Sequence, residues 1–303
     1  MKKIRTVAVF PTMFTLGNLV CGFFAIVVAA RVDVPISVDV PHGEKIVLRS
    51  ANREAAIIDK TNDVHNIMLA GLLIFAAMVF DALDGYIARL ASVSSQFGAE
   101  LDSLCDLVTF GVAPGFLLVK MCPRFEFLHS EAVWIIAASF AVCAALRLAR
   151  FNVETEDDDD HMHFSGLPSP AAAGTVAAFA ILFYTLRVDT SGDPLLIPDR
   201  LFGWELYAVD VDRALQTILP VFAVMLGLLM VSRVPYPHVL NLLLRGDRSF
   251  GHIVGLVFAL AALMLIGRYS ILIVCTSFVL GPPIMFAWRR LVQRRTQQEE
   301  PLF

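Results

Sequence analysis

Charged residues are scarce in this chain. Lysine, arginine, aspartate and glutamate make up 17% of its 303 residues, whereas 57% of the residues are hydrophobic. Soluble domains carry about 25% charged residues, so this composition argues against a soluble globular protein. The high apolar content excludes a disordered chain. The formal net charge is -4, so the chain lacks the excess of basic residues that is typical of nucleic-acid-binding proteins. We therefore expect no nucleic-acid partner.

Cysteine is also sparse. The five cysteines are scattered, and no two of them form a Cys-x-x-Cys pair. An odd number without paired spacing indicates neither a disulfide framework nor a zinc site. We therefore interpret these cysteines as small buried hydrophobic residues.

What the chain does contain is a series of long apolar runs. A helix needs about 20 such residues to cross the hydrocarbon core of a bilayer. The first run keeps Thr15, Gly17 and Asn18, which favours an uncleaved first span over a signal peptide. The pattern predicts an all-α polytopic membrane protein with about eight transmembrane helices, at residues 8–31, 64–88, 96–119, 131–150, 167–187, 213–232, 249–267 and 269–289.

Two polar connections interrupt this pattern, at residues 32–63 and 188–212. The first alternates apolar and polar residues around Val38, so it holds either a small hairpin or nothing ordered. Eight spans put both termini on one side, and both termini are basic. The positive-inside rule makes that side cytoplasmic.

Four aspartates lie where the second predicted span ends and the third begins. Asp81 and Asp84 share one helix face, because they are three residues apart. Asp102 and Asp106 share a face at a spacing of four. A short turn near residues 90–95 would make the two helices antiparallel and bring the two acidic faces together.

Carboxylates gathered in this way repel one another and need a counter-charge. Arg89 alone is insufficient. Mg²⁺ and Mn²⁺ prefer oxygen ligands and bind through carboxylates together with substrate phosphates. The four aspartates therefore predict a metal site with two ions, which could stabilise displacement at a phosphate. Two other interpretations are a helix hairpin with solvated aspartates, and a cation pathway lined by carboxylates.

The same residues carry a family resemblance. The pattern is similar to the signature of the CDP-alcohol phosphotransferases, without a gap or substitution, and reads Asp81-x-x-Asp84-Gly85-x-x-Ala88-Arg89, eight residues, Gly98-x-x-x-Asp102-x-x-x-Asp106. The resemblance implies a six-helix core, transfer of a phosphoryl-alkyl group from a CDP-linked donor to an alcohol, and release of CMP.

The resemblance also implies roles for particular residues. The four aspartates would hold the metal ions, and Asp106 would also be the general base. The CDP group would lie against Gly85, Ala88, Arg89 and Gly98. Thr15 and Asn18 match the family's Thr-Leu-x-Asn pattern in the first span and are added to the CDP-binding set.

Three further segments narrow the choice of alcohol. Residues 164–174, 147–152 and 229–236 resemble segments of the membrane-integral phosphatidylserine synthases of bacteria and archaea. This resemblance implies CDP-diacylglycerol and L-serine as substrates. Candidate contacts to serine or phosphate are Arg147, Arg150, Asn152 and Ser169. The alternative acceptors are glycerol 3-phosphate and inositol phosphate, whose phosphates call for additional basic residues.

The resemblance extends over about residues 8–236. We therefore expect a membrane core over residues 1–236, with the two polar connections as insertions, and two additional helices with a basic tail over residues 237–303. It also implies a homodimer. The expected location is a bacterial or archaeal inner membrane, with the active site on the cytoplasmic face.

Overall fold

The computed structural model is almost entirely helical, as the composition predicts. It describes residues 9–32, 37–39, 45–47, 53–91, 96–123, 125, 131–157, 166–188, 195–197, 206–236 and 269–299. Seven helical stretches in this part of the chain are long and apolar enough to cross a membrane. They confirm an integral membrane protein. The predicted span at 249–267 lies outside the described residues.

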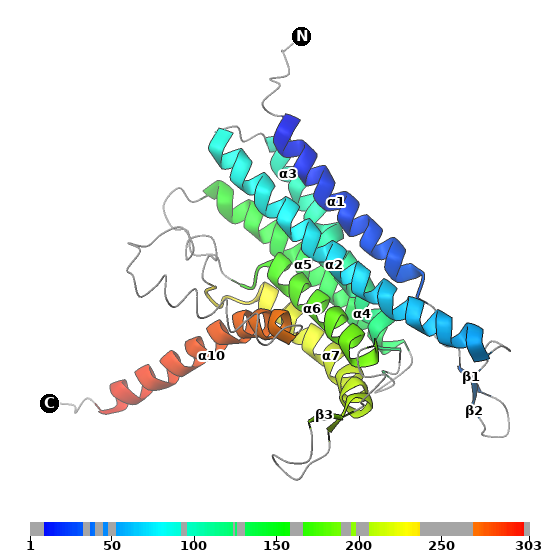
Figure 1. Cartoon of the computed structure of the whole chain (residues 1–303). Coiled ribbons are helices and arrows are strands. Elements are labelled where there is room, and N and C mark those ends of the chain that lie inside the picture. The colour runs from blue at the N-terminus through cyan, green and yellow to red at the C-terminus, as the bar shows by residue number, and fades with distance from the viewer. Residues whose placement is uncertain are drawn as a thin grey trace, which may run out of the picture.

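The helices follow the chain order of the predicted spans (Figure 1). Their bounds are α1 Val9–Ala30, α2 Arg53–Ala91, α3 Gln96–Asp106, α4 Ala113–Met121, α5 Ala132–Asp157, α6 Ser169–Val188, α7 Ala208–Val231 and α10 Ser270–Glu299. Between α3 and α4 the chain continues as a π-helical segment, η2, over Leu107–Val112.

The first polar connection is more ordered than the sequence alone required. Strands β1 (Ser37–Asp39) and β2 (Lys45–Val47) pair antiparallel as a small hairpin. The membrane span that follows begins at Asp63, close to the predicted boundary, but helix α2 itself begins at Arg53, so the last part of this connection is helical. In the second connection, β3 (Leu195–Ile197) pairs antiparallel with β4 (Leu206–Tyr207).

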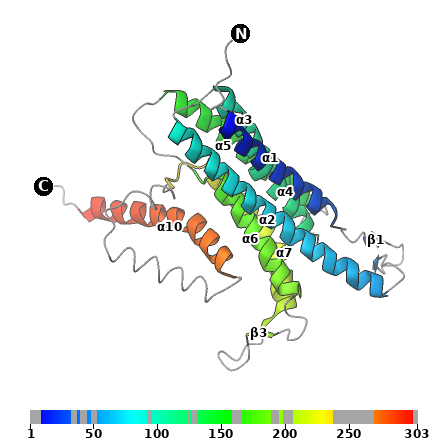
Figure 2. The same cartoon turned by 45° about the horizontal axis from the view of Figure 1, so that its top comes forward.

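Small residues allow the central helices to pack closely. Helix α2 lies between α1 and α6, and α5 packs against α7 and η2 (Figures 1 and 2). A side chain on Gly71 of α2 would come within 2.9 Å of the carbonyl oxygen of Ala177 on α6. Such contacts between small residues are typical of helices packed in a membrane.

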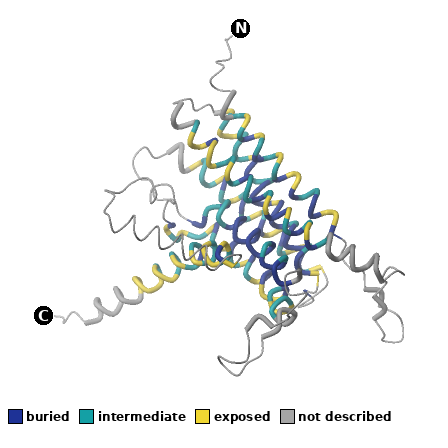
Figure 3. Tube along the Cα trace, viewed as in Figure 1, coloured by how far each residue is buried: buried dark blue, intermediate teal, exposed yellow. Residues whose placement is uncertain are grey.

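Burial follows the same arrangement. Buried residues run through the middle of the bundle, and exposed residues lie on its outer faces (Figure 3). Many of the exposed side chains are large and apolar, among them Phe23, Ile135 and Leu228. An apolar outer surface is expected where lipid, not water, surrounds the protein.

The third predicted span is not one regular helix. The Ala113 N–H bonds to the carbonyl oxygen of Val108, five residues back, which is the π-helical pattern. Pro114 follows in the first turn of α4 and has no N–H to donate. The wider turns of η2 therefore lie directly before a residue that cannot continue the regular hydrogen-bond ladder.

Helix α10 stands apart from the others. Its axis is strongly inclined to those of the bundle in both views (Figures 1 and 2). It packs against α6, and the Tyr236 hydroxyl donates a hydrogen bond of 2.9 Å to the carbonyl oxygen of Val279. Burial raises the pKa of Tyr236 to about 12, so this donor stays protonated at neutral pH.

Candidate metal and phosphotransfer site

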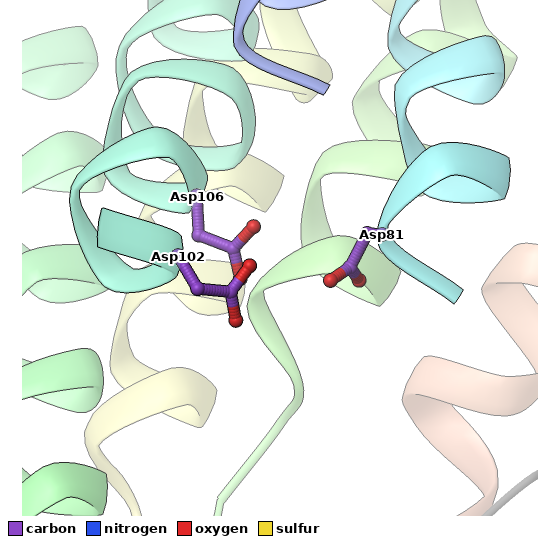
Figure 4. Close-up of side chains that lie close together, drawn as sticks. All are labelled: Asp81, Asp102 and Asp106. Carbon is purple, nitrogen blue, oxygen red and sulfur yellow. The ribbon is translucent and has the colours of Figure 1, made fainter. Parts of the chain in front are cut away.

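Three of the four predicted aspartates meet between α2 and α3. Carboxylate oxygens of Asp81, Asp102 and Asp106 all lie within 4.8 Å of one another (Figure 4). Asp81 comes from α2, and the other two come from α3. The two acidic faces therefore lie together, as the sequence predicts.

The donor set suits a hard divalent cation. All three groups offer carboxylate oxygen, the ligand that Mg²⁺ and Mn²⁺ prefer. One oxygen of Asp102, Oδ1, is buried and has no hydrogen-bond partner among the residues that the structure describes. A buried polar atom without a partner is costly, and a bound ion would satisfy it. The site is therefore compatible with divalent metal use.

Asp84 is arranged differently from the other three. Its side chain is buried and accepts a hydrogen bond from the Thr15 hydroxyl of α1. Among the described residues, the cluster within 4.8 Å does not include it. The structure thus brings Asp84 to α1, whereas the sequence predicts it as a fourth metal ligand.

Asn18 contacts one of the clustered aspartates directly. Its side-chain amide donates a hydrogen bond of 2.8 Å to Oδ1 of Asp106. Its main-chain carbonyl oxygen accepts a hydrogen bond of 3.2 Å from the Thr109 hydroxyl in η2. Sequence reasoning missed Thr109, because no pattern in the sequence marks the π-helical segment that presents it.

Arg147 supplies positive charge close to the carboxylates. It lies on α5, and its charge acts on both Asp81 and Asp106. One of its guanidinium nitrogens donates a hydrogen bond of 2.8 Å to the hydroxyl of Ser169, which is fully buried at the start of α6. The structure therefore brings these two predicted substrate contacts together at the edge of the acidic cluster.

Asn152 and Arg150 lie further along α5, and both are half-buried. The Asn152 amide exchanges hydrogen bonds of 3.1 and 3.3 Å with the hydroxyl of Ser103, which follows Asp102 on α3. Ser103 is a second residue that sequence reasoning missed. Its only signal was its position next to Asp102.

The residues predicted to hold CDP lie on the two acidic helices. Gly85 is exposed on α2, and Gly98 is half-buried near the start of α3. Ala88 and Arg89 are in the last turns of α2, and their side chains lie outside the described residues. The backbone thus puts all four at the end of the bundle that carries the aspartates.

Two further segments singled out in the sequence meet beside α6. The main-chain N–H of Gly166 donates to the carbonyl oxygen of Val234 at 2.8 Å, and that of Leu167 donates to Leu229 at 3.0 Å. Gly166 has a φ of 99°, and a side chain there would come within 2.4 Å of the carbonyl oxygen of Met230. Only glycine fits this turn.

Comparison with known proteins gives a family match over most of the chain. The family model for CDP-alcohol phosphatidyltransferase matches residues 8–229. This range includes every residue of the acidic cluster, together with Thr15, Asn18 and Arg147.

Individual relatives are similar over part of their length. The chain is 35% identical over 165 residues to the CDP-diacylglycerol–serine O-phosphatidyltransferase of Methanocaldococcus jannaschii, covering 54% of this chain and 62% of the relative. It is 34% identical over 177 residues to the protein of that name from Helicobacter pylori strain J99, covering 57% and 62%. An archaetidylserine synthase of Methanothermobacter thermautotrophicus is 36% identical over 119 residues, covering 38% and 48%. The chain thus spans about three fifths of the length of the first two relatives.

Proposed function

The chain belongs to the CDP-alcohol phosphatidyltransferase family, and from this premise we propose that it transfers the phosphatidyl group of CDP-diacylglycerol to the hydroxyl of L-serine. The products are phosphatidylserine and CMP. The names of the relatives from M. jannaschii and H. pylori support this donor and this acceptor. The observation that carries the proposal is the meeting of Asp81, Asp102 and Asp106 between α2 and α3.

The proposed cofactor is Mg²⁺ or Mn²⁺, with two ions held by Asp81, Asp102, Asp106 and Asp84. Asp84 would keep its hydrogen bond from Thr15 through one oxygen and offer the other to an ion. When bound, the ions would neutralise the phosphates of the donor and stabilise the charge that develops on them.

Asp106 is the proposed general base. It would accept the proton of the serine hydroxyl as the serine oxygen forms a bond to the phosphorus that carries diacylglycerol. The bond from that phosphorus to the CMP oxygen breaks, and CMP leaves with the electron pair. Positioning and charge neutralisation would supply most of the rate enhancement, as in phosphoryl transfer generally.

The remaining predicted residues would hold the substrates. Gly85, Ala88, Arg89 and Gly98 would contact the CDP group, with Thr15 beside them. Asn18 was predicted with this set, but its amide donates to Asp106. Arg147, Arg150, Asn152 and Ser169 would contact serine or phosphate. The position of Arg147 beside Asp81 and Asp106 supports this role, because an anion bound there would meet a half-buried positive charge.

The proposal includes the wider setting of the site. We propose that residues 1–236 form the catalytic core, that residues 237–303 are an addition to it, and that the protein works as a homodimer. The active site would face the cytoplasm from the inner membrane of a bacterium or archaeon. A soluble acceptor such as serine and a donor held in the inner leaflet would then meet at the same surface.

The proposal is tested by measuring CMP release from CDP-diacylglycerol by the detergent-purified protein with Mn²⁺ or Mg²⁺. L-serine, glycerol 3-phosphate and inositol phosphate are compared as acceptors. We expect release with serine, loss of release in Asp106→Asn, and retained release in Glu100→Gln, which removes an exposed carboxylate from the same helix. Release with another acceptor only would contradict the choice of serine. No release with any acceptor from folded protein would contradict the enzyme assignment.

A further inference from the structure

Helix α1 contacts both acidic helices through polar side chains of one face. Thr15 donates to Asp84 on α2, and Asn18, one turn further along, donates to Asp106 on α3. The family resemblance assigns Asn18 to the nucleotide. Its observed contact is instead with the carboxylate that we propose as the base.

An aspartate needs such a contact to hold one orientation. The last torsion of its side chain is broad and roughly two-fold, so packing alone leaves the carboxyl plane free to turn. Asp106 is also at the junction where α3 ends and η2 begins. A donor on one of its oxygens fixes the plane and determines which oxygen faces Asp81 and Asp102.

Asn18 is itself held in place. It is fully buried, and its main-chain carbonyl accepts the hydroxyl of Thr109, also fully buried. Gly22, one turn further along α1, allows this approach, since a side chain there would come within 2.8 Å of the Thr109 Cα. Asn18, Asp106 and Thr109 thus form one network between α1 and the third span.

The Asn18 amide is only half satisfied. Its oxygen, Oδ1, is buried and has no hydrogen-bond partner in the described part of the chain, whereas its nitrogen donates a hydrogen bond to Asp106. An apolar side chain of the same size would avoid this cost if packing were the only requirement. Asparagine is therefore needed at this position for the hydrogen bond that its nitrogen donates to Asp106.

We propose that Asn18 is a positioning residue for Asp106, and that Thr109 holds Asn18 in the orientation required. The proposal rests on the proposed function for the role of Asp106 as base, but not for its role in holding a metal ion. Asn18 would act through Asp106 and would not contribute binding energy to the nucleotide.

The test compares Asn18→Leu, which keeps the branched shape of the side chain and removes the donor, with wild type. Mn²⁺ affinity is measured by electron paramagnetic resonance on the purified protein without substrate. CMP affinity is measured at saturating Mn²⁺, and turnover is measured with serine. Outer-shell residues of metal sites are worth about 10- to 100-fold in affinity or activity. We expect a loss of that size in Mn²⁺ affinity and in kcat, with KM for the donor and CMP affinity within about two-fold.

Thr109→Val tests the hydrogen bond from Thr109 to the main chain of Asn18. It gives a result even if Asn18→Leu does not fold. It is expected to weaken Mn²⁺ binding in the same direction, whereas Thr109→Ser, which keeps the hydroxyl, restores it. Thr175→Val is the matched control. Thr175 is also fully buried and donates to a main-chain carbonyl, that of Ala171, but it does so within α6. We expect it to leave Mn²⁺ affinity unchanged.

Two results would overturn the proposal. In the first, Asn18→Leu weakens CMP binding at saturating Mn²⁺ while Mn²⁺ affinity is unchanged, which would make Asn18 a nucleotide contact. In the second, Mn²⁺ affinity and kcat both stay at the wild-type value. If wild-type protein releases no CMP but its Mn²⁺ affinity falls in Asn18→Leu, the proposed function fails while the positioning of Asp106 stands.

Discussion

Asp102 shows how a residue in this site differs from an ordinary buried aspartate. Within the described ranges its Oδ1 is buried without a hydrogen-bond partner, and two other carboxylates lie within 4.8 Å of its own. Like charges so close together destabilise the fold unless a cation neutralises them. The repulsion between these carboxylates lowers the stability of the fold without metal. A bound cation would relieve the repulsion, and this relief would contribute to the free energy of metal binding.

Asp102→Asn is therefore expected to separate stability from metal binding. The change removes one of the repelling charges, so the thermal midpoint in EDTA stays equal or rises. Wild-type protein should gain about 2.7 kcal/mol at a Mn²⁺ concentration 100 times its Kd, whereas the variant should gain little. Activity should fall by on the order of 100-fold or more, since a direct ligand outweighs the outer-shell residues.

The measurement is thermal unfolding in detergent with and without Mn²⁺. Asp212→Asn is a matched control at the other end of the bundle, where Asp212 accepts a hydrogen bond of 2.7 Å from Gln216. It should keep the full Mn²⁺ shift. A full shift in Asp102→Asn as well would exclude Asp102 from the metal site.

At the scale of the helix, the third span depends on its close contact with α1. Segment η2 presents Thr109 towards α1, and Gly22 leaves room for its backbone. An added side chain on Gly22 would lie 2.8 Å from the Thr109 Cα, and a main-chain atom cannot turn aside. The position of Asp106 therefore depends on a glycine that belongs to neither acidic helix.

Gly22→Ala is expected to lower the free energy of unfolding by about 1–3 kcal/mol, the usual cost of overpacking. Mn²⁺ affinity should fall with it, because Asp106 lies at the start of the displaced segment. Gly281→Ala is the control, since no atom of the described residues, apart from the neighbouring backbone of its own helix, lies within 4 Å of the added methyl group. Alanine is favoured over glycine inside a helix by roughly 0.5–1 kcal/mol, so the control is expected to keep or gain stability. Equal thermal midpoints for the two variants would contradict the close contact.

For the whole molecule, the acidic site lies towards one end of the bundle. Asp81 and Asp84 are near the end of the span Asp63–Ile87, and Asp102 and Asp106 are in the first half of the span Phe97–Met121. The cluster thus belongs to two adjacent spans. A cation pathway would need acidic residues at mid-membrane depth on several spans, so this position favours chemistry at a membrane surface.

The number of spans determines where the C-terminus lies. Eight spans, with 249–267 as the seventh, would put both termini on one side, which their basic residues predict to be the cytoplasm, whereas the seven spans of the described residues alone would put them on opposite sides. We expect a C-terminal green fluorescent protein fusion to fluoresce and a C-terminal alkaline phosphatase fusion to be inactive. The same fusions after residue 190 are the control, since that connection is predicted to lie outside. An active phosphatase at the C-terminus would contradict eight spans.

The sequence alone determined the class of the protein and most of its site. Apolar runs decide membrane insertion because each run must satisfy its own backbone in lipid, whatever its neighbours are. The spacing of Asp81, Asp102 and Asp106 determined that their faces meet, because helical periodicity and a short turn leave little choice.

Only the tertiary structure decided what surrounds those carboxylates. The hydrogen bonds from Thr15 to Asp84 and from Asn18 to Asp106 join helices far apart in the chain, and that from Arg147 to Ser169 joins two consecutive helices. The sequence does not predict the π-helical turns after Asp106 either. They depend both on Pro114, which has no N–H to donate, and on the packing of the segment against Gly22 of α1. Periodicity describes one helix at a time, whereas these contacts depend on the distance and rotation between helices.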